Sequence, residues 1–353
     1  MATAGVAKAG IVCAGNWIVD IVHTAPYWPT KGDLVRLSGR QIGVGGGAAN
    51  VMTDLHAFGA RLPLAAIGAI GPDTNGEIIR DHCARIGVPT GHLVTLHGSL
   101  TAYDEVINIP ADSRTFFYHG GANDAFDVAH VPVTALAAQG YKIFYLGYLM
   151  LLGALDARRP DGSTGAADLL AQVRAAGMIT CVDMVSDAHP DFRAIVAPAL
   201  PHCDFVIINE IEAGRAAGLD VRGPDGALLQ DRLRAAAAVL LGDVQRAVIV
   251  HAPEGALWAA QGEGPIWAAS QPLAADWIVS PVGAGDAFCA AVLYGIHEDW
   301  PPLQTLHIAH LAAKACLAGA TATDGIPTLA ALMADYTKNQ TGGPERPAAK
   351  GTL

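Results

Sequence analysis

Short apolar runs that lack polar residues at every second position recur along this chain, and most are followed by a segment with helical periodicity. A strand that is apolar on both sides must be buried on both faces, which is typical of parallel sheets covered by helices. The alternation therefore predicts a doubly wound α/β fold with a mostly parallel sheet. The runs expected to form strands are GIVCAG (10–15), LPLAAIG (62–68), KIFYLG (142–147), ITCVDM (179–184), DFVIIN (204–209) and AVIVHA (247–252).

Two stretches depart from this alternation. Residues 21–44 and 97–120 show polar–apolar alternation around turn signals such as PTKGD and PADS, as antiparallel strands do. We expect them to form a small β lid, with lid segments at about 17–46 and 97–120 inserted in the main domain. The exposed edges of such a lid could pair two copies into a homodimer. The polar, Pro/Gly-rich end, 338–353, is expected to be a flexible tail.

Composition limits the partners of the chain. Apolar residues make up 52% of the 353 residues and charged residues 16%, which is typical of a globular protein. The formal net charge is −11, and Lys and Arg do not cluster anywhere in the sequence. A nucleic-acid binder or a protein that docks on an anionic membrane needs such a cluster, so neither partner is expected.

The cysteines and the apolar runs indicate the cellular compartment in which the protein is expected. The six cysteines lack C-x-x-C spacing and mostly lie in apolar runs, which favours buried free thiols in a reducing, cytoplasmic environment. The N-terminal run is broken by Gly15, Asn16 and Asp20, so it is interpreted as a first strand and not as a signal sequence. The apolar run 143–155 is too short to span a bilayer. A soluble protein is expected.

The stretch VSPVGAGDAFCAAVLYG (279–295) predicts a loop that opens into a buried helix. Glycines at 283 and 285 allow a ligand to approach the free amides of the first helical turn, which suit an anion such as a phosphoryl group. Asp286 lies in that turn, where the helix dipole favours its ionised form, so it could take a proton from a hydroxyl. An ordinary helix cap is the alternative interpretation.

A second glycine cluster, RQIGVGGGAAN (40–50), precedes another helical segment. Gly43 to Ala48 can be aligned with the dinucleotide fingerprint G-x-G-x-x-A, which leaves an NAD-dependent oxidoreductase as one interpretation. That interpretation is weak, because no acidic residue ends a second strand about twenty positions on. A G-x-x-x-x-G-K-[ST] phosphate loop is absent from the sequence.

Taken together, the motifs resemble a known family. GGGAAN followed by IGAIGPDTNG (67–76), with GAGDAF some 210 residues later, is similar to the ribokinase-like (PfkB) sugar kinases over residues 9 to 330. The resemblance implies a Rossmann-like, three-layer αβα kinase domain at 9–335 with a small β-sheet lid. It also implies an enzyme that uses ATP and Mg²⁺ to phosphorylate a primary hydroxyl of a small sugar or nucleoside.

The resemblance also assigns roles to residues. Asp286 matches the catalytic base of the family, and Gly283, Ala284 and Gly285 match its anion hole. Asp20, Gly46 and Asn50 match contacts to the substrate. Asn209 and Glu212 match an N-x-x-E element that orders Mg²⁺ and phosphate through water, so Glu212 is the expected metal-side residue.

Departures from the family pattern concern the nucleotide and the cation. Ser280 and Pro281 stand where the family has Asp-Thr, and since that aspartate commonly helps to bind a monovalent cation, K⁺ activation is doubtful. His251, Ala252 and Pro253 replace a Gly-containing turn, so contacts to adenine or ribose near His251 and Gly255 are expected to differ. These departures motivate an alternative function, a non-catalytic sugar- or nucleoside-binding sensor on the same scaffold.

The lid is expected to select the acceptor. Aromatic residues such as Trp17, Trp28, Phe116, Phe117 and Tyr118 could stack on a base or on a sugar face, or could form the lid core. Arg114 could approach an acidic substrate or lie at the surface. The sequence therefore leaves the identity of the acceptor open.

Overall fold

A computed structural model of the chain describes residues 9–59, 61–109, 114–274 and 277–341. Within these ranges the largest sheet has the strand order β13-β12-β11-β10-β9-β8-β1-β4-β5. The pairs from β11 through β5 are parallel, while β12 and β13 add an antiparallel edge. The strands are β1 (Gly10–Gly15), β4 (Leu64–Ile70), β5 (Leu93–Thr95), β8 (Tyr141–Leu149), β9 (Ile179–Met184), β10 (Phe205–Asn209), β11 (Ala247–Ala252), β12 (Gly255–Ala260) and β13 (Ile266–Ala269).

The central strands are buried on both sides because successive side chains point to opposite faces. In β1, Val12 and Ala14 belong to one apolar core, whereas Ile11 and Cys13 belong to the other. The helices contributing to the first core are α3 (Val133–Ala138), α4 (Gly153–Asp156), α5 (Gly165–Ala175), α6 (Phe192–Val196), α7 (Glu210–Ala217) and α8 (Gln230–Leu241). Those contributing to the second are α1 (Gly47–Ala57), α2 (Thr74–Arg85), α9 (Ala284–His297), α10 (Pro302–Leu317) and α11 (Leu329–Thr341).

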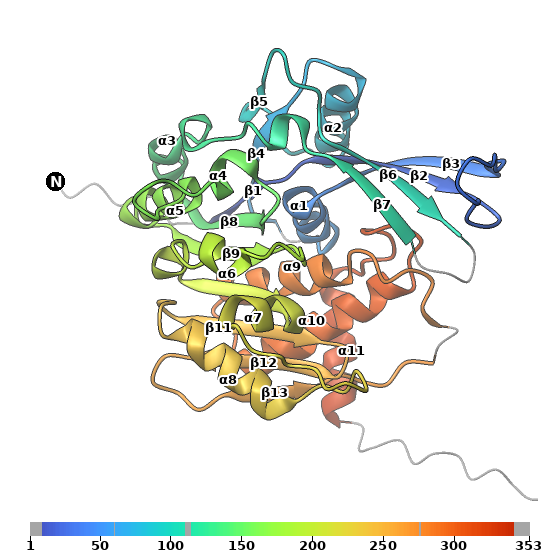
Figure 1. Cartoon of the computed structure of the whole chain (residues 1–353). Coiled ribbons are helices and arrows are strands. Elements are labelled where there is room, and N and C mark those ends of the chain that lie inside the picture. Colours follow the sequence, from blue (N-terminus) through green and yellow to red (C-terminus); the bar gives the residue numbers. More distant parts are fainter. Residues whose placement is uncertain (1–8, 60, 110–113, 275–276, 342–353) are drawn as a thin grey trace, which may run out of the picture.

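A separate sheet has the order β3-β2-β6-β7, in which β2 and β6 are parallel and the outer pairs are antiparallel. Figure 1 shows these strands extending together beyond the main body. The sheet forms a lid whose members come from two distant segments of the chain. Its strands are β2 (Ile18–Thr24), β3 (Gly39–Gly45), β6 (Tyr103–Asn108) and β7 (Arg114–His119).

The doubly wound, mostly parallel fold with a small second sheet confirms the predicted fold class. The six cysteines are free and buried, as predicted. None of the described helices has the length and apolar character needed to cross a bilayer. Helix α11 continues through residues 338–341, beyond the predicted start of the tail, and 342–353 lie outside the described residues.

Trp17 does not belong to the lid surface. Its side chain is fully buried where β1 leads into β2, and its indole Nε1–H donates to the Ile67 carbonyl at 2.9 Å. Trp28, in contrast, is about half exposed and stacks on Phe117 with ring centroids 6.4 Å apart. Of these two tryptophans, only Trp28 could offer a ring surface to another molecule.

Candidate active site

The site is built around the start of helix α9. Gly283 precedes the helix with φ +86° and ψ −9°, and no side chain caps the first turn. The amides of this turn are therefore available to an anion, and the helix dipole adds a partial positive charge there. Asp286 lies in the same turn and is 5% exposed. The structure thus places a nearly buried carboxylate beside an uncapped helix N-terminus.

Two side chains hold the Asp286 carboxylate. Asn50 of α1 donates through Nδ2 to Oδ2 at 2.9 Å. The Tyr148 hydroxyl lies 2.9 Å from Oδ2 and 3.0 Å from Oδ1, so it can donate to either oxygen. Burial raises the pKa of Asp286 to about 6, and the hydrogen bonds from Asn50 and Tyr148 act in the opposite direction. The carboxylate is therefore oriented, and it is mainly ionised above that pH.

Tyr148 was not foreseen from the sequence. It lies near the end of β8 with φ +61°, a conformation that costs roughly 1–3 kcal/mol for a residue other than glycine and needs support from its surroundings. Part of that support comes from Asp183 in β9: Oδ1 accepts from the Tyr148 amide at 2.5 Å, and Oδ2 accepts from the Tyr145 hydroxyl at 2.6 Å. Asp183 therefore helps to fix the backbone that aims Tyr148 at Asp286.

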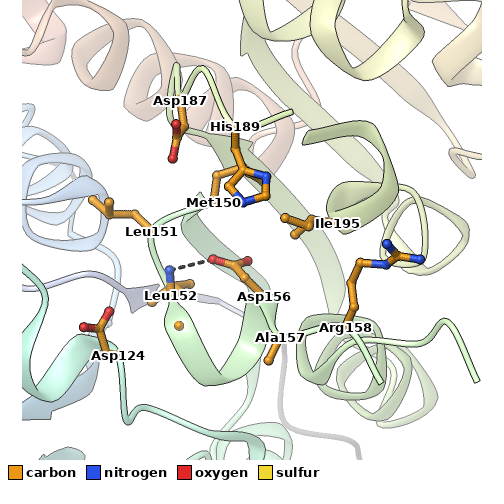
Figure 2. A pocket seen from close by; sticks show the side chains of 11 residues that line it. Asp124, Met150, Leu151, Leu152, Asp156, Ala157, Arg158, Asp187, His189 and Ile195 are labelled. Atoms are coloured by element: carbon orange, nitrogen blue, oxygen red, sulfur yellow. Dashed lines mark hydrogen bonds between the residues drawn. The ribbon is translucent and has the colours of Figure 1, made fainter. Parts of the chain in front are cut away.

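The turn between β8 and α4 is stabilised by a further hydrogen bond. The Leu152 amide donates to Asp156 Oδ2 at 2.6 Å, which fixes the start of α4 (Figure 2). A cavity of about 380 Å³ lies here, lined by Asp124, Met150 and Asp187 among others. It contains none of the predicted site residues, and a second cavity, of about 770 Å³, lies elsewhere.

Replacing Tyr148 by phenylalanine should move the acid limb of the kcat profile. The variant removes a hydrogen bond that favours the ionised carboxylate, so the pKa of Asp286 should rise further above about 6. A hydrogen bond to a charged group contributes ~1.5 kcal/mol or more, so the limb should shift upward by roughly one pH unit. Measuring kcat from pH 5 to 9 checks this. Tyr141→Phe, at the far end of β8, is the control, and an unmoved limb in Tyr148→Phe would contradict the role.

The expected acceptor-side residues lie near Asp286. Asp20 in β2 packs over Gly45, where a Cβ atom would collide with the Asp20 carboxylate. Burial raises the pKa of Asp20 to about 7, and the negative charges of Asp104 and Asp286 raise it further, while Arg114 lowers it. The charge of Asp286 therefore acts on Asp20 across the site. Gly46 has φ +90° and immediately precedes α1, the helix that contains Asn50.

The second cavity, of about 770 Å³, borders the N-terminus of α9. Ala284 and Gly285 line it, together with Asn209 at the end of β10 and His251 near the end of β11. Helices α10 and α11 contribute its far wall through residues such as His307, His310, Lys314, Tyr336 and Asn339. The cavity therefore sits where the carboxyl ends of two parallel strands meet an uncapped helix N-terminus.

Of the two residues predicted to contact the nucleotide base or ribose, His251 lines the cavity and Gly255 does not. The His251 ring lies 4.9 Å from the Phe288 ring, and burial lowers its pKa to about 4, so it is neutral at physiological pH. Gly255, the first residue of β12, does not line the cavity. A Cβ atom there would collide with the Trp267 ring, so Gly255 is required for packing between β12 and β13.

Glu212 and Asn209 form a reciprocal cap at the start of α7. Glu212 Oε2 accepts from the Asn209 amide at 2.9 Å, and Asn209 Oδ1 accepts from the Glu212 amide at 2.9 Å. Glu212 Oε1 accepts from Asn209 Nδ2 at 2.7 Å and from Ser186 Oγ at 2.8 Å. Within the described ranges, no three His, Cys, Asp or Glu side chains gather closely enough to hold a metal. Both Glu212 oxygens are thus engaged, and burial raises the pKa of Glu212 to about 7. A carboxylate held in this way would reach a Mg²⁺ ion only through the water shell of the ion.

The mostly parallel sheet flanked by helices, together with the small second sheet, matches ribokinase-like structures. The family model for pfkB family carbohydrate kinases matches residues 8–329, and the chain belongs to that family. A relative, 5-dehydro-2-deoxygluconokinase of Geobacillus kaustophilus, is 24% identical over 318 residues, covering 86% of this chain and 87% of the relative.

Solved structures agree with this fold. Ribokinase of Arabidopsis thaliana, complexed with ribose and ATP, is 21% identical with a TM-score of 0.73, covering 93% of this chain and 99% of that one. A nucleoside kinase of Burkholderia thailandensis, in complex with inosine, is 16% identical with a TM-score of 0.70, covering 95% and 100%. Membership of the family supports a sugar or nucleoside kinase.

Proposed function

We propose that the protein transfers the γ-phosphoryl group of ATP to a primary hydroxyl of a small sugar or nucleoside, with Asp286 as general base. One observation supports this most strongly. Ala284 and Gly285 line the 770 Å³ cavity, while the adjacent Asp286 carboxylate contacts Asn50 and Tyr148 near Asp20. The first turn of α9 thus borders a cavity large enough for a nucleotide and also carries the carboxylate that contacts the proposed acceptor-binding side chains.

The transfer would follow from this arrangement. The acceptor oxygen attacks the γ-phosphorus, its proton passes to the Asp286 carboxylate, and the bond to the β-phosphate oxygen breaks to release ADP. The amides of residues 283–285 would stabilise the charge on the transferred group. Mg²⁺ would neutralise phosphate charge when bound, and Glu212 and Asn209 would hold it through water. The neutral His251 ring, beside Phe288, offers an aromatic surface to the base of the nucleotide.

The test is ADP release that depends on an acceptor. The protein is incubated with ATP, Mg²⁺ and single sugars or nucleosides, and ADP is measured with and without each compound. A kinase releases ADP well above the acceptor-free rate with at least one compound and yields its phosphate ester. A sensor would bind a compound, detected by a shift in Tm, without forming ADP, and that result would overturn the proposal.

We further propose that two copies associate through the lid. β3 and β7 are the edges of the lid sheet, and exposed apolar side chains lie on the face turned away from Asp20 or in the loop beside it: Trp28, Leu34, Leu37, Ile42 and Phe117. A second lid could cover them. Light scattering should give about twice the 36.4 kDa chain mass. Phe117→Asp should reduce the mass to that of a monomer and Val239→Asp, an exposed apolar position in α8, should not. A monomeric parent protein would contradict the proposal.

A further inference from the structure

The polar atoms left without partners around Asp20 are all acceptors. Asn50 Oδ1 and Asp104 Oδ1 are buried and have no hydrogen-bond partner among the described residues, and neither does Asn16 Oδ1 in the turn between β1 and β2. A buried polar atom without a partner costs about 1–3 kcal/mol, so native structures satisfy such atoms with protein, water or ligand. Several unsatisfied acceptors in one region suit a ligand that brings hydrogen-bond donors.

Asp104 faces the same side of the lid as Asp20. The parallel strands β2 and β6 pair Asp20 directly with Asp104, and paired residues in neighbouring strands point to the same face. Asp104 is one of the charges that raise the pKa of Asp20, and burial raises the pKa of Asp104 itself to about 6. The next residue, Glu105, points to the opposite face, where it pairs with His23 at 2.6 Å.

From these contacts we infer that Asp104 is a second acceptor-binding carboxylate, and that the site takes an uncharged or cationic acceptor rich in hydroxyl or amino donors and rejects carboxylated sugars. This inference rests on the proposed kinase function and adds the charge class of its substrate. Hydroxyl and amino groups can donate to Asp20 and Asp104 together, as paired acceptors require. The chemical class is a polyol, an amino sugar or a nucleoside.

Charge supports this selection. Asp20, Asp104 and Asp286 already lie close enough for Asp20 to be affected by both of the others. A substrate carboxylate would add a further negative charge to this partly desolvated site, and like charges at short range are unfavourable. Arg114 is the one cation among the described residues whose charge is found to act on Asp20. Its guanidinium donates to the Ala320 carbonyl at 3.3 Å, so it already bridges the lid to the loop after α10.

Matched pairs of acceptors, with and without a carboxylate, test the inference that the site rejects carboxylated substrates, which we call the charge rule. The protein with ATP and Mg²⁺ is assayed with glucose, glucosamine and gluconate, with ribose and ribonate, and with uridine and orotidine, which is uridine carrying a carboxylate. We expect kcat/KM for the best neutral or amino compound to exceed that of its carboxylated partner by at least ~100-fold. Binding is measured in parallel as a shift in Tm, with the same expected order.

The residue is tested with Asp104→Asn and a neighbouring control. Loss of a hydrogen bond to a charged group should raise KM for the preferred acceptor by about 10–100-fold, with kcat and KM for ATP changed by less than about threefold. The variant should also narrow the gap between the neutral compound and its carboxylated partner. Glu105→Gln, on the opposite face of the same strand, should leave both properties unchanged.

The outcomes separate the two proposals. Efficient phosphorylation of a carboxylated sugar, lost in Arg114→Gln, would overturn the charge rule and leave the kinase function standing. An unchanged KM in Asp104→Asn would remove Asp104 from the site. If no compound in the panel binds or is phosphorylated, both the kinase proposal and this inference fail.

Discussion

Asp286→Asn should lower kcat by about 10²–10⁴-fold, because a general base contributes on that order and an amide cannot accept the proton. Substrate binding should change little. Asparagine has almost the same shape as aspartate, and its oxygen can still accept the hydrogen bond from Asn50. In the parent protein kcat should fall as the pH drops through about 6, where the carboxyl group takes up a proton. The variant should lose this dependence.

Stability gives an independent check on the same variant. The folded-state pKa of Asp286 is raised from 3.8 to about 6, so the native state prefers the neutral carboxyl group. Native stability therefore decreases as the pH rises from about 4 to 6 and stays lower above that range. A pKa raised from 3.8 to about 6 corresponds to a free energy on the order of 3 kcal/mol, which sets the largest gain in free energy of unfolding expected for Asp286→Asn at pH 8.

These expectations are checked by steady-state kinetics and by urea unfolding at several pH values. Asp231→Asn, whose side chain in α8 is almost fully exposed, is the control and should match the parent protein. A variant that keeps the parent kcat would show that Asp286 is not the base. A variant with low kcat and much weaker substrate binding would indicate a structural role instead.

The parallel sheet could be predicted because the burial of each strand is recorded in its own short stretch of sequence. A strand buried on both faces must be apolar throughout, as GIVCAG in β1 shows, so the parallel strands are visible in the sequence. The antiparallel hairpin β12–β13 was missed. Its strands, GALWAA and IWAA, are rich in alanine and contain one β-branched residue between them, so they lack the composition that favours strands; they pair antiparallel beyond β11.

The candidate site was only partly predictable, because only some of its residues stand in local sequence motifs. Asp286, Asn50 and Asp20 stand in recognisable motifs, and the structure brings them together. Tyr148 lies in an apolar run, and its role depends on a positive φ that is supported by Asp183 in a neighbouring strand. Asp104 becomes informative only through its register with Asp20. Such roles arise from contacts between distant segments, which periodicity and spacing do not report.

Gly283 and Gly285 are neighbours in one motif, yet their replacement by alanine should have opposite effects on stability. Gly283 has φ +86°, and a Cβ atom there would collide with the Ala322 backbone. The left-handed conformation costs about 1–2 kcal/mol for an L residue, and the collision adds to it. Gly283→Ala should therefore lower the free energy of unfolding by at least about 2 kcal/mol. It should also lower kcat by about 10²-fold, the order expected when one anion-hole donor is displaced.

Gly285 lies inside the helix, and a Cβ atom there would approach only the His251 ring, at 3.4 Å from Cε1. Gly285→Ala should leave stability unchanged or raise it by about 0.5–1 kcal/mol, since alanine favours helices. The added methyl group would enter the cavity beside the amides, so KM for ATP should rise several-fold while KM for the acceptor stays constant. Urea unfolding and steady-state kinetics measure both variants. If Gly283→Ala unfolds at the parent midpoint with full activity, or if Gly285→Ala raises only the acceptor KM, the nucleotide does not bind at this helix N-terminus.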